Sequence, residues 1–134
     1  MVSTVSQVIR VTHLDVVDLI RRTTASGKSQ RINLHPDVDD PLHEMVICHL
    51  GNHIPRPHRH PDKAVSLTTL VGDAELYIYD DKGRPFESYS LDRGMQSIVR
   101  IPPGIWYAQK VLTNHWVFIE TLRGPWKTEH TEWM

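Results

Sequence analysis

The sequence lacks several features that define whole classes of protein. It contains a single cysteine, Cys48, which excludes an internal disulfide framework. No uncharged apolar run approaches the roughly 20 residues that a membrane-spanning helix needs, and the first residues lack the basic segment and apolar core of a secretory signal. The formal net charge is −1 and there is no basic run, which argues against nucleic-acid binding. These absences predict a cytoplasmic protein that binds neither nucleic acid nor membranes.

What the sequence does contain is histidine. The chain has 134 residues, enough for one domain with its own core, and nine of them are histidines. Five of the nine lie between His43 and His60. An excess of histidine is typical of metal binding, proton transfer or pH sensing. The region from His43 to His60 is therefore the first place to look for a functional site.

The first element is predicted to be a helix over residues 13–25. Thr12 is placed to cap its N-terminus, with Asp15 completing a capping box, and Ser26–Gly27 ends it. We expect its apolar stripe to consist of Leu14, Val16, Val17 and Ile20.

The rest of the chain consists of short alternating segments separated by turns, the pattern of a β-sandwich or β-barrel. The expected strands are residues 31–35, 43–50, 65–71, 74–79, 86–91, 96–101, 106–112 and 115–122. The Gly72–Asp73 turn predicts a hairpin between strands 65–71 and 74–79. The polar tail, residues 128–134, is expected to be loosely held.

The strongest local signal for chemistry is Arg56-Pro57-His58-Arg59-His60. Alternate residues of a strand point to the same face, so His58 and His60 project side by side, a spacing that suits chelation of one metal ion by two imidazoles. The alternative is a pair of surface histidines beside an arginine. The nearby His43, His49 and His53 either approach this motif or are buried and hydrogen-bonded.

Several separated motifs, in the same order, resemble the cupin superfamily and within it the WbuC-type cupins. Those are small proteins of the RmlC-like jelly-roll superfamily that are associated with bacterial surface-polysaccharide gene clusters. The motifs are Arg31-x-Asn33-x-His35, Pro57-His58-Arg59-His60-Pro61 with Lys63, Tyr79-Asp80, Pro102-Pro103-Gly104-Ile105-Trp106 and Glu120-Thr121-x-x-Gly124-Pro125-Trp126. The resemblance covers residues 13–126.

This resemblance implies an all-β fold, the cupin double-stranded β-helix (jelly-roll barrel) with one N-terminal α-helix. Residues 1–27 then hold the helix packed on the barrel, residues 28–126 form the cupin barrel, and residues 127–134 form a C-terminal tail. Because small cupins commonly pair through edge strands, a homodimer is expected by analogy.

The resemblance also implies one divalent metal ion (Fe, Mn, Ni or Zn) bound through His58 and His60. Two of the four ligands of the family pattern are replaced here, the glutamate by Val65 and the last histidine by Tyr107. Valine cannot bind a metal, and a phenol with a pKa of about 10 binds one at a cost at neutral pH. The implied ligand set, His58, His60 and Tyr107, is therefore degenerate, and a protein without a cofactor is the alternative.

Other polar residues are predicted to bind a small ligand. Arg31, Asn33 and His35 alternate with apolar residues, so they face either solvent or a pocket, and the resemblance places them in a pocket. There arginine suits a carboxylate or phosphate, and asparagine and histidine suit hydroxyls. The full predicted ligand-binding set is Arg31, Asn33, His35, Lys63, Trp106, Gln109 and Glu120.

The last four residues of this set are included for different reasons. The resemblance places Lys63 at the rim of the site, and the alternative is a solvated lysine. Trp106 covers the barrel mouth, stacks on a sugar ring or simply packs. Gln109 faces the same way as Tyr107, two residues away. Glu120 lies in an otherwise apolar strand, so we expect its carboxylate to pair with a cation or line a cavity.

Three function hypotheses follow. In the first, a WbuC-like cupin binds a metal ion and acts on or senses a small polar molecule, such as a sugar, in surface-polysaccharide or sugar metabolism. In the second, a metal-free module binds an anionic or hydroxylated ligand without turnover. In the third, the protein is a sugar isomerase with His58 or His60 as the general base and Tyr107 as the general acid, the candidates being His60 and Tyr107.

Overall fold

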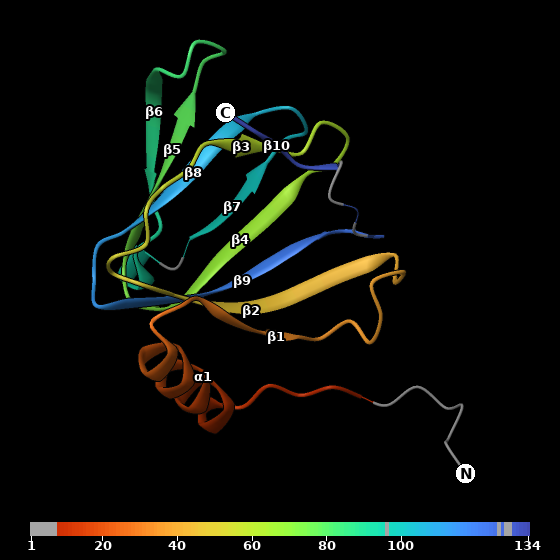
Figure 1. The fold of residues 1–134 in the computed structure, drawn as a ribbon, viewed down its shortest axis with the longest axis vertical. Helices are drawn as coiled ribbons and strands as arrows, with labels where there is room; N and C mark the ends of the chain where they lie inside the picture. The colour runs from red at the N-terminus through yellow and green to blue at the C-terminus, as the bar shows by residue number, and fades with distance from the viewer. Residues whose placement is uncertain (1–7, 96, 126, 128–129) are drawn as a thin grey trace.

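The computed structural model describes residues 8–95, 97–125, 127 and 130–134. Its strands form two five-stranded antiparallel sheets, with one α-helix before them, which confirms the predicted all-β class with an N-terminal helix (Figure 1). In chain order the elements are α1 (His13–Ser26), β1 (Gln30–Asn33), β2 (Leu42–Leu50), β3 (His58–Arg59), β4 (Val65–Val71), β5 (Ala74–Tyr79), β6 (Pro85–Ser90), the 3-10 helix η1 (Arg93–Met95), β7 (Ile98–Ile101), β8 (Trp106–Val111), β9 (His115–Arg123) and β10 (Glu132–Trp133).

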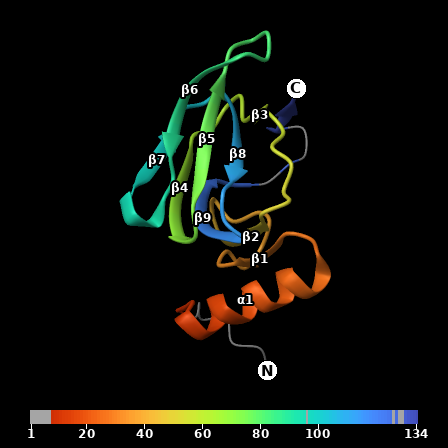
Figure 2. The same cartoon turned by 90° about the vertical axis from the view of Figure 1, so that its left-hand side faces the viewer.

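The two sheets stack as a sandwich. The first sheet has the order β1-β2-β9-β4-β7 and the second has the order β10-β3-β8-β5-β6. The longest pairing joins β2 to β9, with Leu42 opposite Arg123 at one end and Leu50 opposite His115 at the other. Helix α1 packs across the outer face of the first sheet, against β1, β2 and β9 (Figure 2). One end of the sandwich therefore has β1 and β10 as its open edges, and the other has β7 and β6.

The capping signals in the sequence are confirmed. The Asp15 backbone N–H donates to the Thr12 hydroxyl at 3.3 Å, and the Thr12 backbone N–H donates to the Asp15 carboxylate at 2.7 Å. At the other end Gly27 adopts a left-handed conformation, with φ of 70°, and its N–H donates to the Thr23 carbonyl. No helix within the described residues is long and apolar enough to span a membrane.

The apolar stripe of the helix was predicted correctly only in part, because Val16 and Ile20 belong to the apolar cluster under the helix but Leu14 and Val17 are exposed. The residues that α1 buries are Val16, Leu19 and Thr23, whereas Leu14 is 76% exposed. At 100° per residue, Leu14 lies on the far side of the helix from Val16, so both cannot face one sheet. Thr23 tolerates burial because its hydroxyl donates to the Leu19 carbonyl at 2.8 Å.

The predicted hairpin between β4 and β5 is also wrong. β4 pairs with β7 and β9, and β5 pairs with β6 and β8, so the Gly72–Asp73 turn carries the chain from one sheet to the other. Gly72 has a φ of 82°, and a Cβ there would lie 2.3 Å from the His115 carbonyl oxygen. Glycine is therefore required by a close approach of two backbones at a sandwich corner.

The tail is better held than expected, because Glu132 and Trp133 pair with Arg59 and His58 as β10. The Met134 N–H also donates to the Pro57 carbonyl at 3.1 Å. Some predictions lie outside the described residues: Gln96 as the start of a strand, Trp126 of the last motif, and residues 1–7 of the N-terminal segment.

Apolar side chains fill the space between the sheets at the end away from β1 and β10. Leu67, Leu76 and Trp116 are fully buried there, and Trp116 stacks on Phe118 with ring centroids 3.8 Å apart. A second cluster, with Val16 and Leu19, lies between α1 and the first sheet. Since the apolar filling does not extend to the other end, polar side chains face inward there.

Candidate functional site

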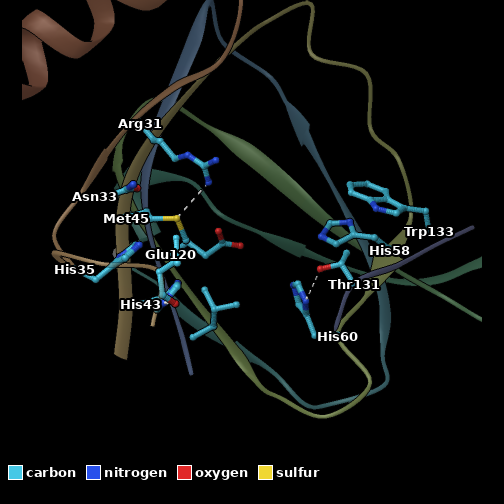
Figure 3. A pocket seen from close by; sticks show the side chains of 12 residues that line it. Arg31, Asn33, His35, His43, Met45, His58, His60, Glu120, Thr131 and Trp133 are labelled. Atoms are coloured by element: carbon cyan, nitrogen blue, oxygen red, sulfur yellow. Dashed lines mark hydrogen bonds between the residues drawn. The ribbon is translucent and has the colours of Figure 1, made fainter. Parts of the chain in front are cut away.

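A cavity of about 220 Å³ lies between the two sheets at this polar end. One wall comes from β1, β2 and β9 and the loop after β1, and the other from β3 and β10 (Figure 3). The lining residues are Arg31, Asn33, His35, Val38, His43, Met45, His58, His60, Glu120, Leu122, Thr131 and Trp133. The cavity is thus built mainly from polar side chains.

Strand register explains why the first wall is continuous. Asn33 lies opposite Met45, and Met45 lies opposite Glu120, so one row of inward side chains crosses three strands. Residues two positions apart share a face, so Arg31 and Leu122 extend the same wall. The structure places the predicted trio Arg31, Asn33 and His35 together here, although β1 ends at Asn33 and His35 lies beyond it.

Arg31 has an unusual environment for a guanidinium. It donates a hydrogen bond to the Met45 sulfur at 3.5 Å, and thioether sulfur is a weak acceptor. Within the described part of the chain, no carboxylate forms an ion pair with Arg31. A guanidinium has five N–H donors, so most of its capacity is available on the cavity side.

Glu120 faces the opposite wall from within the cavity (Figure 3). Burial raises the pKa of its carboxyl from 4.5 to about 7, while the positive charge of Arg31 acts in the opposite direction. Among the described residues Glu120 forms no ion pair with a cation, and its side chain lines the cavity. The carboxyl carries a proton for much of the time near neutral pH.

His58 and His60 converge as the sequence predicts, with ring centroids 5.7 Å apart. The Nδ1 atom of His58 lies 3.1 Å from the Arg56 carbonyl oxygen, and that of His60 lies 3.2 Å from the Thr131 hydroxyl. Burial lowers the pKa of both rings, that of His60 to about 4. Both imidazoles are consequently neutral at pH 7.

Tyr107 does not line the cavity. Its side chain is 1% exposed in the core, and its ring centroid lies 4.3 Å from that of His58. The hydroxyl is buried without a hydrogen-bond partner, and burial raises the Tyr107 pKa well above its usual value, with the nearby Glu120 adding to the shift. A phenolate at this position is strongly disfavoured, so the predicted His60 and Tyr107 acid–base pair is not presented to the cavity.

These residues do not fit the divalent metal that the resemblance implies. Val65, at the position of the missing glutamate, is 1% exposed in the core, and Tyr107 stays protonated. Among the residues that the structure describes, no three His, Cys, Asp or Glu side chains are grouped to hold a metal ion. Two imidazoles offer a divalent cation fewer protein ligands than such metal sites use.

The other cavity histidines are held in place by stacking and hydrogen bonds. His35 stacks on His43 with centroids 4.0 Å apart, and the Nε2 atom of His43 lies 2.9 Å from the Val38 carbonyl oxygen. A Cβ on Gly124 would lie 2.5 Å from the His43 ring, so glycine is needed where the chain passes it. The sequence left the location of His43 open, and the structure puts it in the wall.

His49 and His53 lie away from the cavity. Their rings stack with centroids 4.0 Å apart, and the Ser29 hydroxyl lies 2.6 Å from the Nδ1 atom of His49. Burial lowers the pKa of His49 to about 3. This pair therefore follows the buried, hydrogen-bonded alternative.

Three of the predicted ligand-binding residues lie outside the cavity lining. The Lys63 ammonium donates to the carbonyls of Arg123 at 3.0 Å and Pro125 at 3.4 Å. Trp106 is covered by the guanidinium of Arg59, 4.4 Å from its ring centroid, and Gln109 is buried in β8. Lys63 and Trp106 consequently have structural contacts in place of a rim role.

Two of the four residues of the second wall, Thr131 and Trp133, were not predicted from the sequence. Thr131 and Trp133 line the cavity from β10, although the tail was expected to be loose. Trp133 lies between His58, with centroids 4.9 Å apart, and the guanidinium of Arg56, 4.5 Å from the ring. The alternation of Thr131 and Trp133 about Glu132 was the available signal for a short strand.

Two antiparallel sheets around an inward-facing polar cavity define a jelly-roll barrel of the cupin kind, and similar solved structures agree. Oxalate decarboxylase from Bacillus subtilis superposes with a TM-score of 0.61 at 18% identity, over 79% of this chain and 27% of that one. CapF bound to 3-isopropenyl-tropolone gives 0.65 at 15% identity, over 78% and 31%. KdgF from Halomonas sp. gives 0.59 at 15%, over 75% and 82%. At these low sequence identities, the structural similarity shows a shared fold.

Residues 15–91 match the family described as Domain of unknown function (DUF6016), and the chain belongs to this family. It spans about a quarter to a third of the oxalate decarboxylase and CapF chains. Manganese(II) centres are described for the oxalate decarboxylase, whereas the donor set here does not reproduce such a centre. No curated protein sequence matches this chain.

Proposed function

We propose that this protein binds a small hydroxylated anion, such as a sugar acid, in the cavity without the help of a metal ion. The observation that carries the proposal is Arg31, whose guanidinium faces the cavity and forms no ion pair with a carboxylate among the described residues. A planar carboxylate accepts two parallel N–H bonds from such a fork. The carboxylate of the ligand then forms the ion pair that the Arg31 guanidinium lacks in the free protein.

The rest of the wall suits hydroxyl groups. Asn33 both donates and accepts hydrogen bonds. Because Nδ1 of the neutral His58 ring donates to the Arg56 carbonyl, its Nε2 is left as an acceptor for a ligand hydroxyl. The cavity, at about 220 Å³, lies below the roughly 300–1,000 Å³ of drug-sized ligand sites. It therefore favours an occupant of about one sugar ring.

The biological setting rests on the sequence. The WbuC-type motifs favour a role in surface-polysaccharide or other sugar metabolism, and the single cysteine favours a cytoplasmic location.

The test compares glucuronate with glucose, two sugars of the same ring size that differ in the carboxylate. Isothermal titration and amide chemical shifts are measured for the wild-type chain and for Arg31→Gln. We expect glucuronate to bind at least about tenfold more tightly than glucose, and Arg31→Gln to remove this preference. Equal affinity for the two sugars, or no shift at cavity residues with glucuronate and malate, contradicts the proposal.

A second candidate function is proton transfer on the bound ligand, and Glu120 favours it. A carboxyl with a pKa of about 7 that faces a cavity is suited to take and return a proton near neutral pH. Glucuronate incubated in D₂O should then exchange a carbon-bound hydrogen in the presence of wild-type protein and not with Glu120→Gln. Binding without exchange limits the function to recognition.

A further inference from the structure

Two charged or ionisable groups of the polar cavity are separated by the side chain of Met45. Arg31 donates to the Met45 sulfur, and Met45 lies opposite Glu120 in the register of β2 and β9. Figure 3 shows the Arg31 guanidinium and the Glu120 carboxyl both directed into the cavity, with the Met45 sulfur beside them. The same wall therefore presents a cation and a carboxyl that do not pair with each other.

The immediate surroundings of the Glu120 carboxyl do not stabilise its ionised form. On the two neighbouring strands the residues opposite Glu120 are Met45 of β2 and Leu67 of β4, which are both apolar. Within the described part of the chain, no group donates a hydrogen bond to this carboxyl. Burial accordingly raises its pKa to about 7. When the carboxyl is protonated, it becomes a hydrogen-bond donor on the cavity side.

The ionisable side chains around Glu120 come from several elements. They are Arg31 of β1, His35 of the loop after β1, His43 of β2, His58 and His60 of β3, and Tyr107 of β8. The positive charge of Arg31 lowers the pKa of Glu120. Burial keeps the side chains of His58, His60 and Tyr107 neutral near pH 7. A carboxylate bound to Arg31 cancels the Arg31 charge and adds its own, so it raises the pKa of Glu120 further.

We propose that a ligand carboxylate binds between Arg31 and Glu120, and that an ionised Glu120 takes up a proton from solvent when this ligand binds. The inference rests on the proposed binding of a hydroxylated anion at Arg31. One oxygen of the ligand carboxylate accepts from the guanidinium, and the other accepts from the protonated Glu120 carboxyl. An ionised Glu120 would repel the same ligand. The site therefore binds carboxylates more weakly as pH rises through the pKa of Glu120.

The test is isothermal titration of wild type and Glu120→Gln with glucuronate at pH 6 and pH 8, where the ligand carboxylate stays ionised. We expect wild type to bind about tenfold more weakly at pH 8, because about one molecule in ten is protonated one pH unit above a pKa of about 7. The amide of Glu120→Gln has the shape of the protonated acid and donates an N–H. This variant should therefore bind equally well at both pH values, and more tightly than wild type at pH 8.

Glu44→Gln is the matched control, because Glu44 lies on the neighbouring strand β2 but lines a different hollow, beside α1. It should keep the wild-type pH dependence, and circular dichroism checks that each variant is folded at both pH values. Titrations at pH 8 in phosphate and in Tris, which differ in ionisation enthalpy, should show an uptake of nearly one proton by wild type.

The outcomes separate this inference from the proposed function. Glucuronate binding by wild type that is equally tight at pH 6 and pH 8 overturns the inference and leaves the proposed function standing. A tenfold loss that persists in Glu120→Gln assigns the proton to another group, such as His35 or His43, and also overturns the inference. The absence of glucuronate binding at both pH values overturns the inference together with the proposed function.

Discussion

The two ends of the sandwich share one topology and have opposite chemistry. At the β1–β10 end the inward positions hold Arg31, Glu120 and His58, and a polar cavity results. At the β7–β6 end the inward positions hold residues such as Leu76 and Val99, and an apolar groove results. The strand alternation is the same at both ends. Which molecule each end can accept is therefore decided by the side chains at a few inward positions.

The two ends also differ in how they affect the stability of the folded state. Burying Glu120 and keeping His60 neutral each disfavour a charged form, so the cavity lowers stability to create a binding site. The groove carries no such penalty, but it leaves Ile98 and Phe86 exposed until something covers them. Variants at each end should therefore report on different properties.

The largest expected effect comes from rebuilding a metal site at the cavity end. Val65 and Tyr107 are both inward-facing and buried, and the His58 ring lies next to that of Tyr107. We expect Val65→Glu combined with Tyr107→His to raise divalent-metal affinity by about three orders of magnitude or more, since a carboxylate and a third imidazole complete the donor set. Competition titration with zinc measures this.

The same double variant with His58→Ala and His60→Ala is the control, and it should lose the gain. A folded double variant that gains no affinity would show that these four positions do not converge on one point.

The next largest expected effect is a pH-dependent change in stability at Glu120. Because burial raises the pKa of Glu120 from 4.5 to about 7, the folded chain keeps a proton there that the unfolded chain loses between these pH values. This group therefore removes stability as pH rises through that window. Glu120→Gln should be more stable than wild type by up to about 3 kcal/mol at pH 8, and the difference should vanish below pH 4.5.

Urea unfolding of both chains from pH 4 to 8 measures this difference. The lowered pKa values of His49 and His60 act in the opposite sense in both chains, so they cancel in the comparison. A stability difference that is independent of pH would mean that the Glu120 carboxyl has the same pKa in the folded and the unfolded chain.

A smaller effect is expected at Lys63, which the sequence placed at the rim of the site. Lys63→Met removes the donor to the carbonyls of Arg123 and Pro125, and we expect it to cost about 1–2 kcal/mol of unfolding free energy. Glucuronate affinity should not change, because Lys63 is absent from the cavity lining. The exposed Lys82→Met is the matched control. A lost affinity with unchanged stability would restore the rim role.

The sequence predicted the structure best where a feature depends only on neighbouring residues of the chain. Thr12 and Asp15 cap α1, and Gly27 ends it, because capping depends on neighbouring backbone groups alone. The inward direction of Arg31 and Asn33 followed from alternation and the family motifs. The convergence of His58 and His60 followed in the same way.

Contacts between residues that lie far apart in the sequence could not be predicted in this way. Gly72–Asp73 has the composition of a hairpin turn, and nothing local distinguishes a hairpin from a sandwich corner. Lys63 and Trp106 form their contacts with residues far along the chain or in a neighbouring strand, which a motif does not specify. Trp133 reaches the cavity because β10 pairs with β3, a pairing of only two residues.

The smallest expected effect concerns how firmly β10 is held at the cavity end. Glu132 accepts from Arg59 at 2.8 Å, but both side chains are partly exposed, so Glu132→Gln should cost less than about 1 kcal/mol. Most of the anchoring then comes from Trp133 packed between His58 and Arg56. Hydrogen exchange at the Met134 amide, which bonds to the Pro57 carbonyl, measures local opening in Glu132→Gln and Trp133→Ala. Faster exchange in Glu132→Gln than in Trp133→Ala would show that the ion pair, and not the indole, closes the polar end of the sandwich.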